Sequence, residues 1–242
     1  MDLLKQGPKV KYEDNHLLVL SKPAGMPTVP DSSKDVSLLD LGKKYLKNTR
    51  KKQGNVFLAV VHRLDRPVSG LVTFAITSKA ASRLSKQLRE KKFKKKYLAV
   101  IKADNIGLKG SRGVIDEYLK KDFKRNRVEI VKGEIKNAKR AITTWQILEK
   151  RDDYILLELC PVTGRPHQLR VHVANRLFAP IVGDFKYGSK IKVFKGRGLA
   201  LHSYSLEFFH PTKKELLVFR DSPPNYYPFS IFSDLLKSIA NQ

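Results

Sequence analysis

Short apolar runs bounded by turn residues are the dominant pattern along the chain. A run such as Leu17-Leu18-Val19-Leu20, followed by Pro23-Ala24-Gly25, is typical of a buried β-strand that ends at a turn. Comparable runs recur throughout the 242 residues. The pattern predicts strands within residues 11–22, 57–61, 71–77, 94–102, 141–148, 154–162, 199–209 and 215–219.

Apolar residues three or four positions apart predict helices between these strands, at residues 36–46, 79–91, 167–179 and 229–240. In the second of them Ala80 and Leu84 share one face, and Ser78 is the expected N-cap. The Gly- and Lys-rich stretch from residue 103 to 140 is predicted to form surface hairpins. We therefore expect an α+β fold with a mixed, largely antiparallel central sheet and flanking helices.

Length and composition favour one ordered domain. A chain of 242 residues can bury a sizeable core, and its hydrophobic fraction of 41% is typical of a folded soluble protein. We therefore expect a single domain over residues 1–242. The lone Cys160 follows an apolar run and is expected to be a buried core residue. The chain has no signal peptide and no apolar run of membrane-spanning length, so a cytoplasmic protein is expected.

Charge points to a polyanionic partner. The 48 Lys and Arg residues outnumber the 23 Asp and Glu residues, which leaves a net charge of +25. Aromatic residues are interleaved with the cations at residues 91–97, and such rings stack on bases while cations bind phosphates. This favours a nucleic acid, although a surface that is simply rich in solvated lysines would give the same total. A membrane surface is less favoured, because no terminal helix combines a basic face with a broad aromatic one.

Several common enzyme chemistries lack their motifs. The sequence has no phosphate-binding loop of the G-x-x-x-x-G-K-[ST] type, no strand leading into G-x-G-x-x-G and no H-E-x-x-H. His167 and His172 are five residues apart, which turns them away from each other on a helix. We therefore expect no metal and no small-molecule cofactor.

Two polar clusters remain as candidates for chemistry. The first is His62, Arg63 and Asp65, in a predicted loop that Pro67 and Gly70 favour. The second lies at the start of a predicted helix and comprises Arg165, His167, Gln168, Arg170 and His172. Clusters of this kind are often structural ion pairs or helix caps, so the residues by themselves leave their role open.

The longer strings around these clusters resemble the RluA family of RNA pseudouridine synthases. His62-Arg63-Leu64-Asp65 is similar to the catalytic loop of that family, and residues 96–100 are similar to its aromatic strand. Residues 12–26, 163–172, 181–184, 187–188, 201–202 and 210–211 continue the resemblance in order. The chain departs from the family at Val68 and Pro166, where Thr is usual. Because the pattern begins by Tyr12, we expect no N-terminal S4 domain.

The resemblance implies the pseudouridine synthase fold with an RNA-binding cleft, and isomerisation of uridine in ribosomal or transfer RNA. It implies that Asp65 is the essential ionised carboxylate, with Arg170 as its cationic partner. Tyr97 would stack on the uracil and help to remove the C5 proton. The implied substrate-binding residues are His62, Arg63, Leu64, Arg165, His167, Gln168 and Leu169. We expect a monomer whose partner is RNA and which uses neither a metal nor a cofactor.

Two other functions are compatible with parts of this pattern. A non-catalytic RNA-binding or ribosome-assembly protein could keep the fold, although it would have no need for Asp65, Tyr97 and Arg170 together. A nucleoside-cleaving enzyme that acts on small substrates could keep the carboxylate, but its binding would not weaken steeply with salt.

Overall fold

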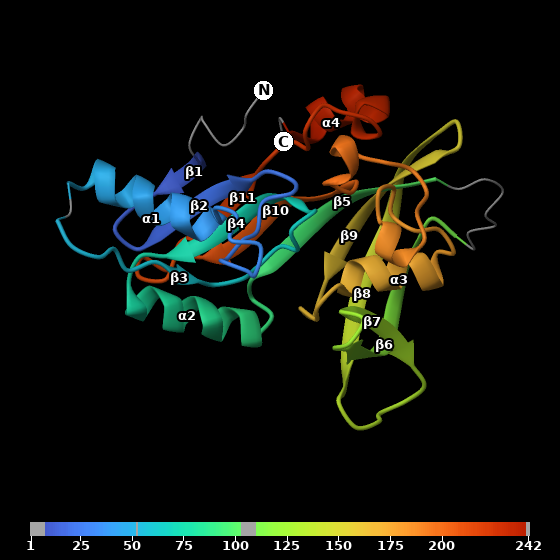
Figure 1. Cartoon of the computed structure of the whole chain (residues 1–242), viewed down its shortest axis with the longest axis horizontal. Helices are drawn as coiled ribbons and strands as arrows, with labels where there is room; N and C mark the ends of the chain where they lie inside the picture. Colours follow the sequence, from blue (N-terminus) through green and yellow to red (C-terminus); the bar gives the residue numbers. More distant parts are fainter. Residues whose placement is uncertain (1–7, 52, 103–109, 241–242) are drawn as a thin grey trace. The chain divides into compact units, whose positions relative to one another are not determined.

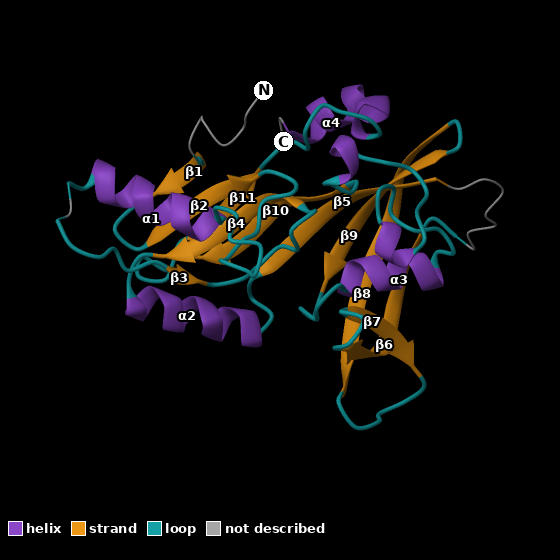
Figure 2. Ribbon diagram, viewed as in Figure 1, coloured by secondary structure: helices purple, strands orange, loops and turns teal. Residues whose placement is uncertain are grey.

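The computed structural model describes residues 8–51, 53–102 and 110–240. Part of the predicted hairpin region, residues 103–109, lies outside the described residues. The described chain forms two compact units: the first runs to Phe93 and also includes Ser203–Asp221, and the second comprises Lys94–His202 and the residues from Ser222 onward. Each unit contains a β-sheet and helices (Figure 2).

The first unit is a sheet with one helix on each face (Figure 1). Its strands are β1 (Lys9–Glu13), β2 (Leu17–Lys22), β3 (Ala59–Val60), β4 (Ser69–Ala75), β11 (Leu216–Arg220) and most of β10 (Leu201–Phe209). They follow the order β1-β2-β4-β10, with β3 paired to β4 and β11 to β10. The pairs β1–β2, β2–β4, β3–β4 and β10–β11 are antiparallel.

Alternation along β2 explains why both faces of this sheet are covered. Leu17 and Val19 pack in one buried cluster with Leu84 of α2 (Ser78–Arg89). Leu20 faces the other way, toward α1 (Leu38–Thr49), where a Cβ added to Gly42 would lie only 3.4 Å from a Leu20 methyl carbon. A strand buried on both faces needs the continuous apolar run that the sequence displays.

The second unit is an antiparallel sheet in the order β5-β9-β8-β6-β7. Its strands are β5 (Lys94–Lys102), β6 (Arg112–Asp122), β7 (Arg127–Val131), β8 (Ala138–Arg151) and β9 (Tyr154–Pro161). Helix α3 (Gln168–Arg176) packs on β6 to β9, and Val171 joins a buried cluster with Leu119 and Ala141. The short helices are η1 (Phe185–Tyr187), η2 (Phe194–Gly196), η3 (Phe229–Phe232) and α4 (Ser233–Ala240). The expected α+β class with a largely antiparallel sheet is confirmed.

Local details correct some of the predicted boundaries. Thr77 rather than Ser78 caps α2, because its hydroxyl accepts a hydrogen bond from the Ala80 N–H at 3.2 Å. Helix α3 begins one residue later than predicted, since His167 has a left-handed backbone with φ of 50°. The predicted helix at 229–240 is divided into η3 and α4.

The expectation that Cys160 is a core residue was wrong, because its side chain is only half-buried. It lies near the end of β9 on the same face as Glu158, whose carboxylate is 3.9 Å from the sulfur. Burial, followed by the charge of Glu158, raises the pKa of the thiol. The thiol is therefore not activated as a nucleophile.

Candidate active site

The loop that carries Asp65 is fixed on both sides by the turn that follows β2. The Thr28 hydroxyl donates to the Leu64 carbonyl at 2.8 Å and accepts from the Leu64 N–H at 3.2 Å. On the other side, the Gly25 N–H donates to the Arg66 carbonyl at 2.9 Å, and the Arg66 Nε donates to the Gly25 carbonyl at 3.0 Å. The backbone at Asp65 is therefore held between two hydrogen-bonded neighbours.

Lys22 is the buried centre of this arrangement, with only 1% of its side chain exposed. Its ammonium donates to the carbonyls of Met26 at 2.6 Å, Pro23 at 3.0 Å and Arg66 at 3.0 Å. Burial lowers the pKa of Lys22 to about 7, while the negative charge of Asp65 acts in the opposite direction. Lys22 thus ties the turn to the Asp65 loop and places a cation in the electrostatic surroundings of the carboxylate.

Of the three residues before Asp65, two are buried and one is exposed. His62 is buried, and its Nε2 accepts a hydrogen bond from the Thr73 N–H of β4 at 3.1 Å. Its ring also meets Phe93 edge-on at a centroid distance of 5.3 Å. Arg63 is exposed, whereas Leu64 is buried. His62 therefore supports the loop, and the predicted RNA contacts of these residues stay predictions.

Gly70 is required where this loop enters β4. Its φ is 113°, and a Cβ at this position would lie 2.3 Å from the Ser203 carbonyl oxygen. No side chain fits there. The Ser-Gly pair that follows the Asp65 loop in the sequence is thus explained by packing.

Tyr97 and Arg170 belong to the second unit. Tyr97 lies on β5 opposite Leu159 of β9, and 7% of its side chain is exposed. Arg170 projects from α3 and is 6% exposed. Its Nε and Nη2 each donate to one oxygen of Asp184 at 2.7 Å. This bidentate geometry fixes the guanidinium plane, and Asp184 is itself 1% exposed.

Tyr187 holds Arg170 from a second side. The guanidinium carbon of Arg170 lies 5.2 Å from the Tyr187 ring centroid, and that of Arg127 lies at the same distance. The Tyr187 hydroxyl accepts from the Val128 N–H at 3.0 Å and lies 2.9 Å from Nδ1 of His167. Tyr187 therefore links Arg170 to the start of β7.

Gln168 is a support for the loop before α3. Its amide oxygen accepts from the Thr163 hydroxyl at 2.7 Å and from the Arg165 N–H at 3.0 Å. Its amide nitrogen donates to the Ile142 carbonyl and to the Thr143 hydroxyl, both at 2.9 Å. These bonds within the protein satisfy the buried Gln168 amide, so its burial is explained without a bound substrate. Its predicted substrate contact stays a prediction.

Two further predicted substrate-binding residues lie near Gln168 in the sequence. Arg165 is half-buried, and its Nε donates to the Arg140 carbonyl at 3.0 Å. Leu169 is buried, with 7% of its side chain exposed. Their predicted contacts with substrate stay predictions.

The roles of Lys22, Asp184 and Tyr187 were not predicted from the sequence. All three stand in strings that resemble the RluA family, which was the available signal. Their partners could not be read from spacing, because Lys22 bonds a carbonyl 44 residues away and Asp184 pairs with an arginine 14 residues away.

In the part of the chain that the structure describes, no group of three or more His, Cys, Asp or Glu side chains could hold a metal ion. None of the helices described in the structure is long and apolar enough to cross a membrane.

Comparison with known proteins decides the family. The family model described as RNA pseudouridylate synthase matches residues 16–175, a range that includes Asp65, Tyr97 and Arg170. The chain belongs to this family. The expectation of a pseudouridine synthase, which is an isomerase, is confirmed.

Curated relatives and solved structures agree with this family. The chain is 36% identical over 237 residues to ribosomal large subunit pseudouridine synthase C of Buchnera aphidicola, covering 95% of this chain and 70% of that protein. It is 32% identical over 216 residues to the dual-specificity RNA pseudouridine synthase RluA of Haemophilus ducreyi, covering 88% and 91%. The structure of human RNA pseudouridylate synthase domain containing 4 matches with a TM-score of 0.74 and 26% identity, covering 94% and 92%. The pseudouridine synthase fold is thereby confirmed.

The position of Lys22 predicts a large effect for Lys22→Met. The change removes the three hydrogen bonds that the Lys22 ammonium donates, one of them to the Arg66 carbonyl of the Asp65 loop. The loop keeps its Thr28 and Gly25 bonds to the turn but can shift, because its buried anchor is missing. A displacement of about 1 Å at a reacting group can cost about 100-fold in rate, so we expect pseudouridine formation at saturating RNA to fall about 100-fold. The rate should be measured from about one pH unit below to about two units above the pKa of about 7.

Two readouts separate this positioning role from simple instability. The Lys22 ammonium loses its proton as pH rises through about 7, so any rate that depends on its charge is present below that pH and lost above it. Lys22→Met should lack this alkaline decline, whereas Lys44→Met, at an exposed site on α1, should retain both the rate and the decline. A Lys22→Met enzyme with the unchanged rate and pH profile would refute the role.

Proposed function

We propose that this chain isomerises uridine to pseudouridine in ribosomal or transfer RNA, with Asp65 as its essential carboxylate. The observation that carries the proposal is the family match across residues 16–175, which spans both candidate clusters. Related proteins named for activity on ribosomal RNA or transfer RNA, or for dual specificity, support the substrate class.

The proposed reaction is redox-neutral. The bond between ribose C1′ and uracil N1 breaks, a bond from C1′ to C5 forms, N1 gains a proton and C5 loses one. No oxidant, reductant or energy source enters this balance, so we propose that the enzyme needs neither metal nor cofactor. A uridine stacked in an RNA helix must first be flipped out, at a cost of a few kcal/mol.

The proposed catalytic residues act on different parts of the reaction. Ionised Asp65 attacks the ribose or the base, or removes a ribose proton. Arg170 supplies the positive charge that favours the ionised carboxylate, and its bidentate pairing with Asp184 supports a fixed orientation. Tyr97 stacks on the uracil and assists removal of the C5 proton. Leu169 packs against the base.

The remaining site residues are proposed to bind RNA. They are His62, Arg63, Leu64, Arg165, His167 and Gln168. Exposed Arg63 is suited to a phosphate, whereas His62 and Gln168 would act mainly by holding their loops. We also propose that the protein acts as a cytoplasmic monomer.

The basic face of α2 is a further proposed contact with the RNA backbone. Lys79, Lys86 and Arg89 are exposed on it. Part of this charge is already engaged, because Lys86 lies 3.7 Å from Glu90, and the Arg83 guanidinium donates to the Pro211 carbonyl at 2.7 Å. This helix therefore offers weaker phosphate binding than its composition alone indicates.

Mapping pseudouridines across all cellular RNA, with and without this protein, tests the proposal. We expect one or more uridines to be modified only when the protein is present. Purified protein should then restore those sites in RNA from the deficient cells without added nucleotide or metal. If the two maps are identical and the purified protein modifies nothing, the alternative of a non-catalytic RNA-binding protein on the same fold is favoured.

A further inference from the structure

The turn between β6 and β7 carries the most exposed large hydrophobic side chain of the described residues. Phe123 is 79% exposed, although a phenyl ring normally gains by burial. The turn is not an unstructured tip, because the Asp122 carboxylate accepts from the N–H groups of Lys124 at 2.9 Å and Arg125 at 3.1 Å. The hydrogen-bonded turn therefore keeps the Phe123 ring exposed to solvent.

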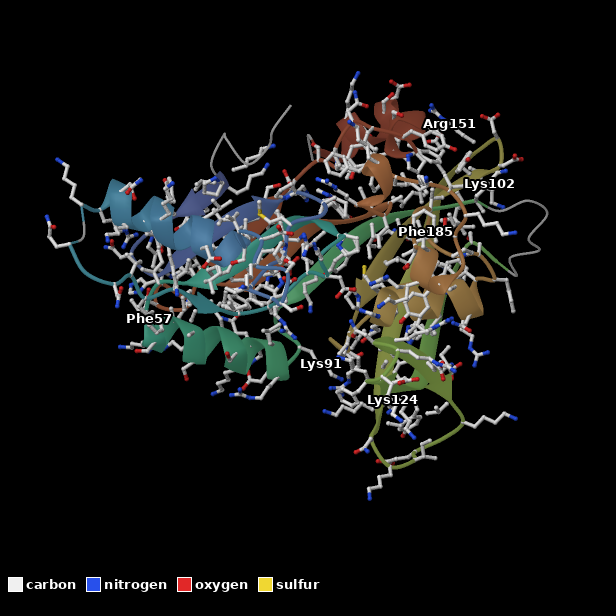
Figure 3. All side chains as sticks on the ribbon, in the orientation of Figure 1. Phe57, Lys91, Lys102, Lys124, Arg151 and Phe185 are labelled. Carbon is white, nitrogen blue, oxygen red and sulfur yellow. The ribbon has the colours of Figure 1, made fainter. Side chains whose placement is uncertain are left out.

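The cations around this ring are dense, and most of them are exposed. Residues 120–127 contain five Lys or Arg residues and one acid, Asp122, which is engaged in the turn. The Lys121 ammonium lies 5.0 Å from the Phe123 ring centroid. Lys124, labelled in Figure 3, and Arg125 are both exposed, and the Arg125 Nε also lies 3.8 Å from the Asp122 carboxylate. This combination of phosphate-binding cations with an exposed ring is suited to a nucleic-acid strand.

The hairpin is anchored to the structure that holds Arg170. Five residue pairs join β6 to β7, from Tyr118 opposite Val131 to Asp122 opposite Arg127. In and next to the turn, the Val128 N–H donates to the Tyr187 hydroxyl, and Lys186 donates to the Asn126 carbonyl at 2.7 Å. Tyr187 is the same ring that packs against Arg170. An RNA held at the tip would therefore be held at a fixed place in the unit that carries Arg170.

We propose that this hairpin is an RNA-docking element, in which Phe123 stacks on a nucleobase while Lys124 and Arg125 bind the flanking phosphates. The proposal rests on the proposed function, since it assigns a second contact to the same RNA substrate. Because stacking accepts every base, the element adds affinity and orientation without reading a sequence.

Phe123→Ala is the direct test. Stacking of one base on an aromatic ring contributes about 1–3 kcal/mol, so we expect RNA affinity to fall about tenfold, with Phe123→Trp restoring it. The probes are a fluorescent oligouridylate of about 12 nucleotides and total ribosomal and transfer RNA from cells that lack the protein. Phe178→Ala is the matched control, because Phe178 is 74% exposed in the same unit but outside the hairpin.

The charge part of the proposal has its own control. Removing two phosphate contacts by Lys124→Gln with Arg125→Gln should reduce the slope of log affinity against log salt by about 0.7 per contact. Lys150→Gln with Lys237→Gln removes the same net charge from exposed positions elsewhere in the unit and should leave the slope unchanged.

Binding is measured in the Asp65→Asn background, so that this proposal and the catalytic one fail separately. Equal affinity of Phe123→Ala and Phe178→Ala for both probes would overturn the docking element and leave the hairpin as a surface for a protein partner. If instead pseudouridine forms in the Asp65→Asn protein, the catalytic assignment fails, while the affinity comparison still decides the role of the hairpin.

Discussion

Asp65→Asn is expected to abolish pseudouridine formation, with a loss of at least about 10⁴-fold, and to leave RNA affinity nearly unchanged. The amide matches the carboxylate in size but carries no negative charge, so it can neither attack nor accept a proton as the carboxylate does. Leu64 and Arg66 hold the loop through backbone groups and the Arg66 side chain, and these bonds survive the substitution.

The measurement pairs single-turnover rates with equilibrium binding on the same RNA. Glu215→Gln provides a matched control, since it also removes one carboxylate from the first unit, at an exposed position between β10 and β11. A rate within tenfold of the unchanged enzyme would show that the charge of Asp65 is not essential.

Arg170→Leu is expected to lower both activity and stability. Its guanidinium is the bidentate partner of the buried Asp184, and an uncompensated buried charge costs about 3–5 kcal/mol. We expect a loss of about 10³-fold in rate, because the proposed cationic partner of Asp65 is removed. Thermal unfolding and pseudouridine formation should be measured on the same preparations.

The double variant Arg170→Leu with Asp184→Leu separates the two effects. Replacing both partners of a buried ion pair by apolar residues is often neutral for stability, so the unfolding temperature should recover. Activity should not recover, because the guanidinium is still missing. Recovery of activity together with stability would mean that Arg170 serves only the fold.

The strands nearest the site follow directly from local sequence patterns. The apolar runs at residues 17–20 and 71–77 predicted β2 and β4, and Pro67 with Gly70 indicated the loop between β3 and β4. A strand is recognised by which of its neighbouring side chains face the core, and the spacing of apolar residues along the sequence shows this directly. The exchange of Ser78 for Thr77 as the cap of α2 is a one-residue error, because both residues can supply the same hydroxyl.

The supports of the site could not be predicted in the same way. Thr28 bonds a residue 36 positions away, and Lys22 bonds one 44 positions away. Such partners meet only after the chain has folded, and a buried lysine has no local pattern of its own. The resemblance to a family could mark these positions, but their hydrogen bonds come from the structure.

The exposure of Phe123 is a further property that spacing does not reveal. The sequence predicted surface hairpins in this region, and β6 and β7 form one. Whether a phenylalanine in a hairpin faces the core depends on register. Here the turn bonds at Asp122 leave Phe123 outside both strands.

Release of tritium from RNA labelled at uracil C5 tests the central claim most directly. Joining C1′ to C5 forces the C5 hydrogen to leave, so purified enzyme should release one tritium for each pseudouridine formed, in the presence of a metal chelator and without nucleotide. The Asp65→Asn protein should bind the same RNA and release none. The labelled RNA should come from cells that lack the protein. If the unchanged protein binds this RNA but releases no tritium, the account is contradicted.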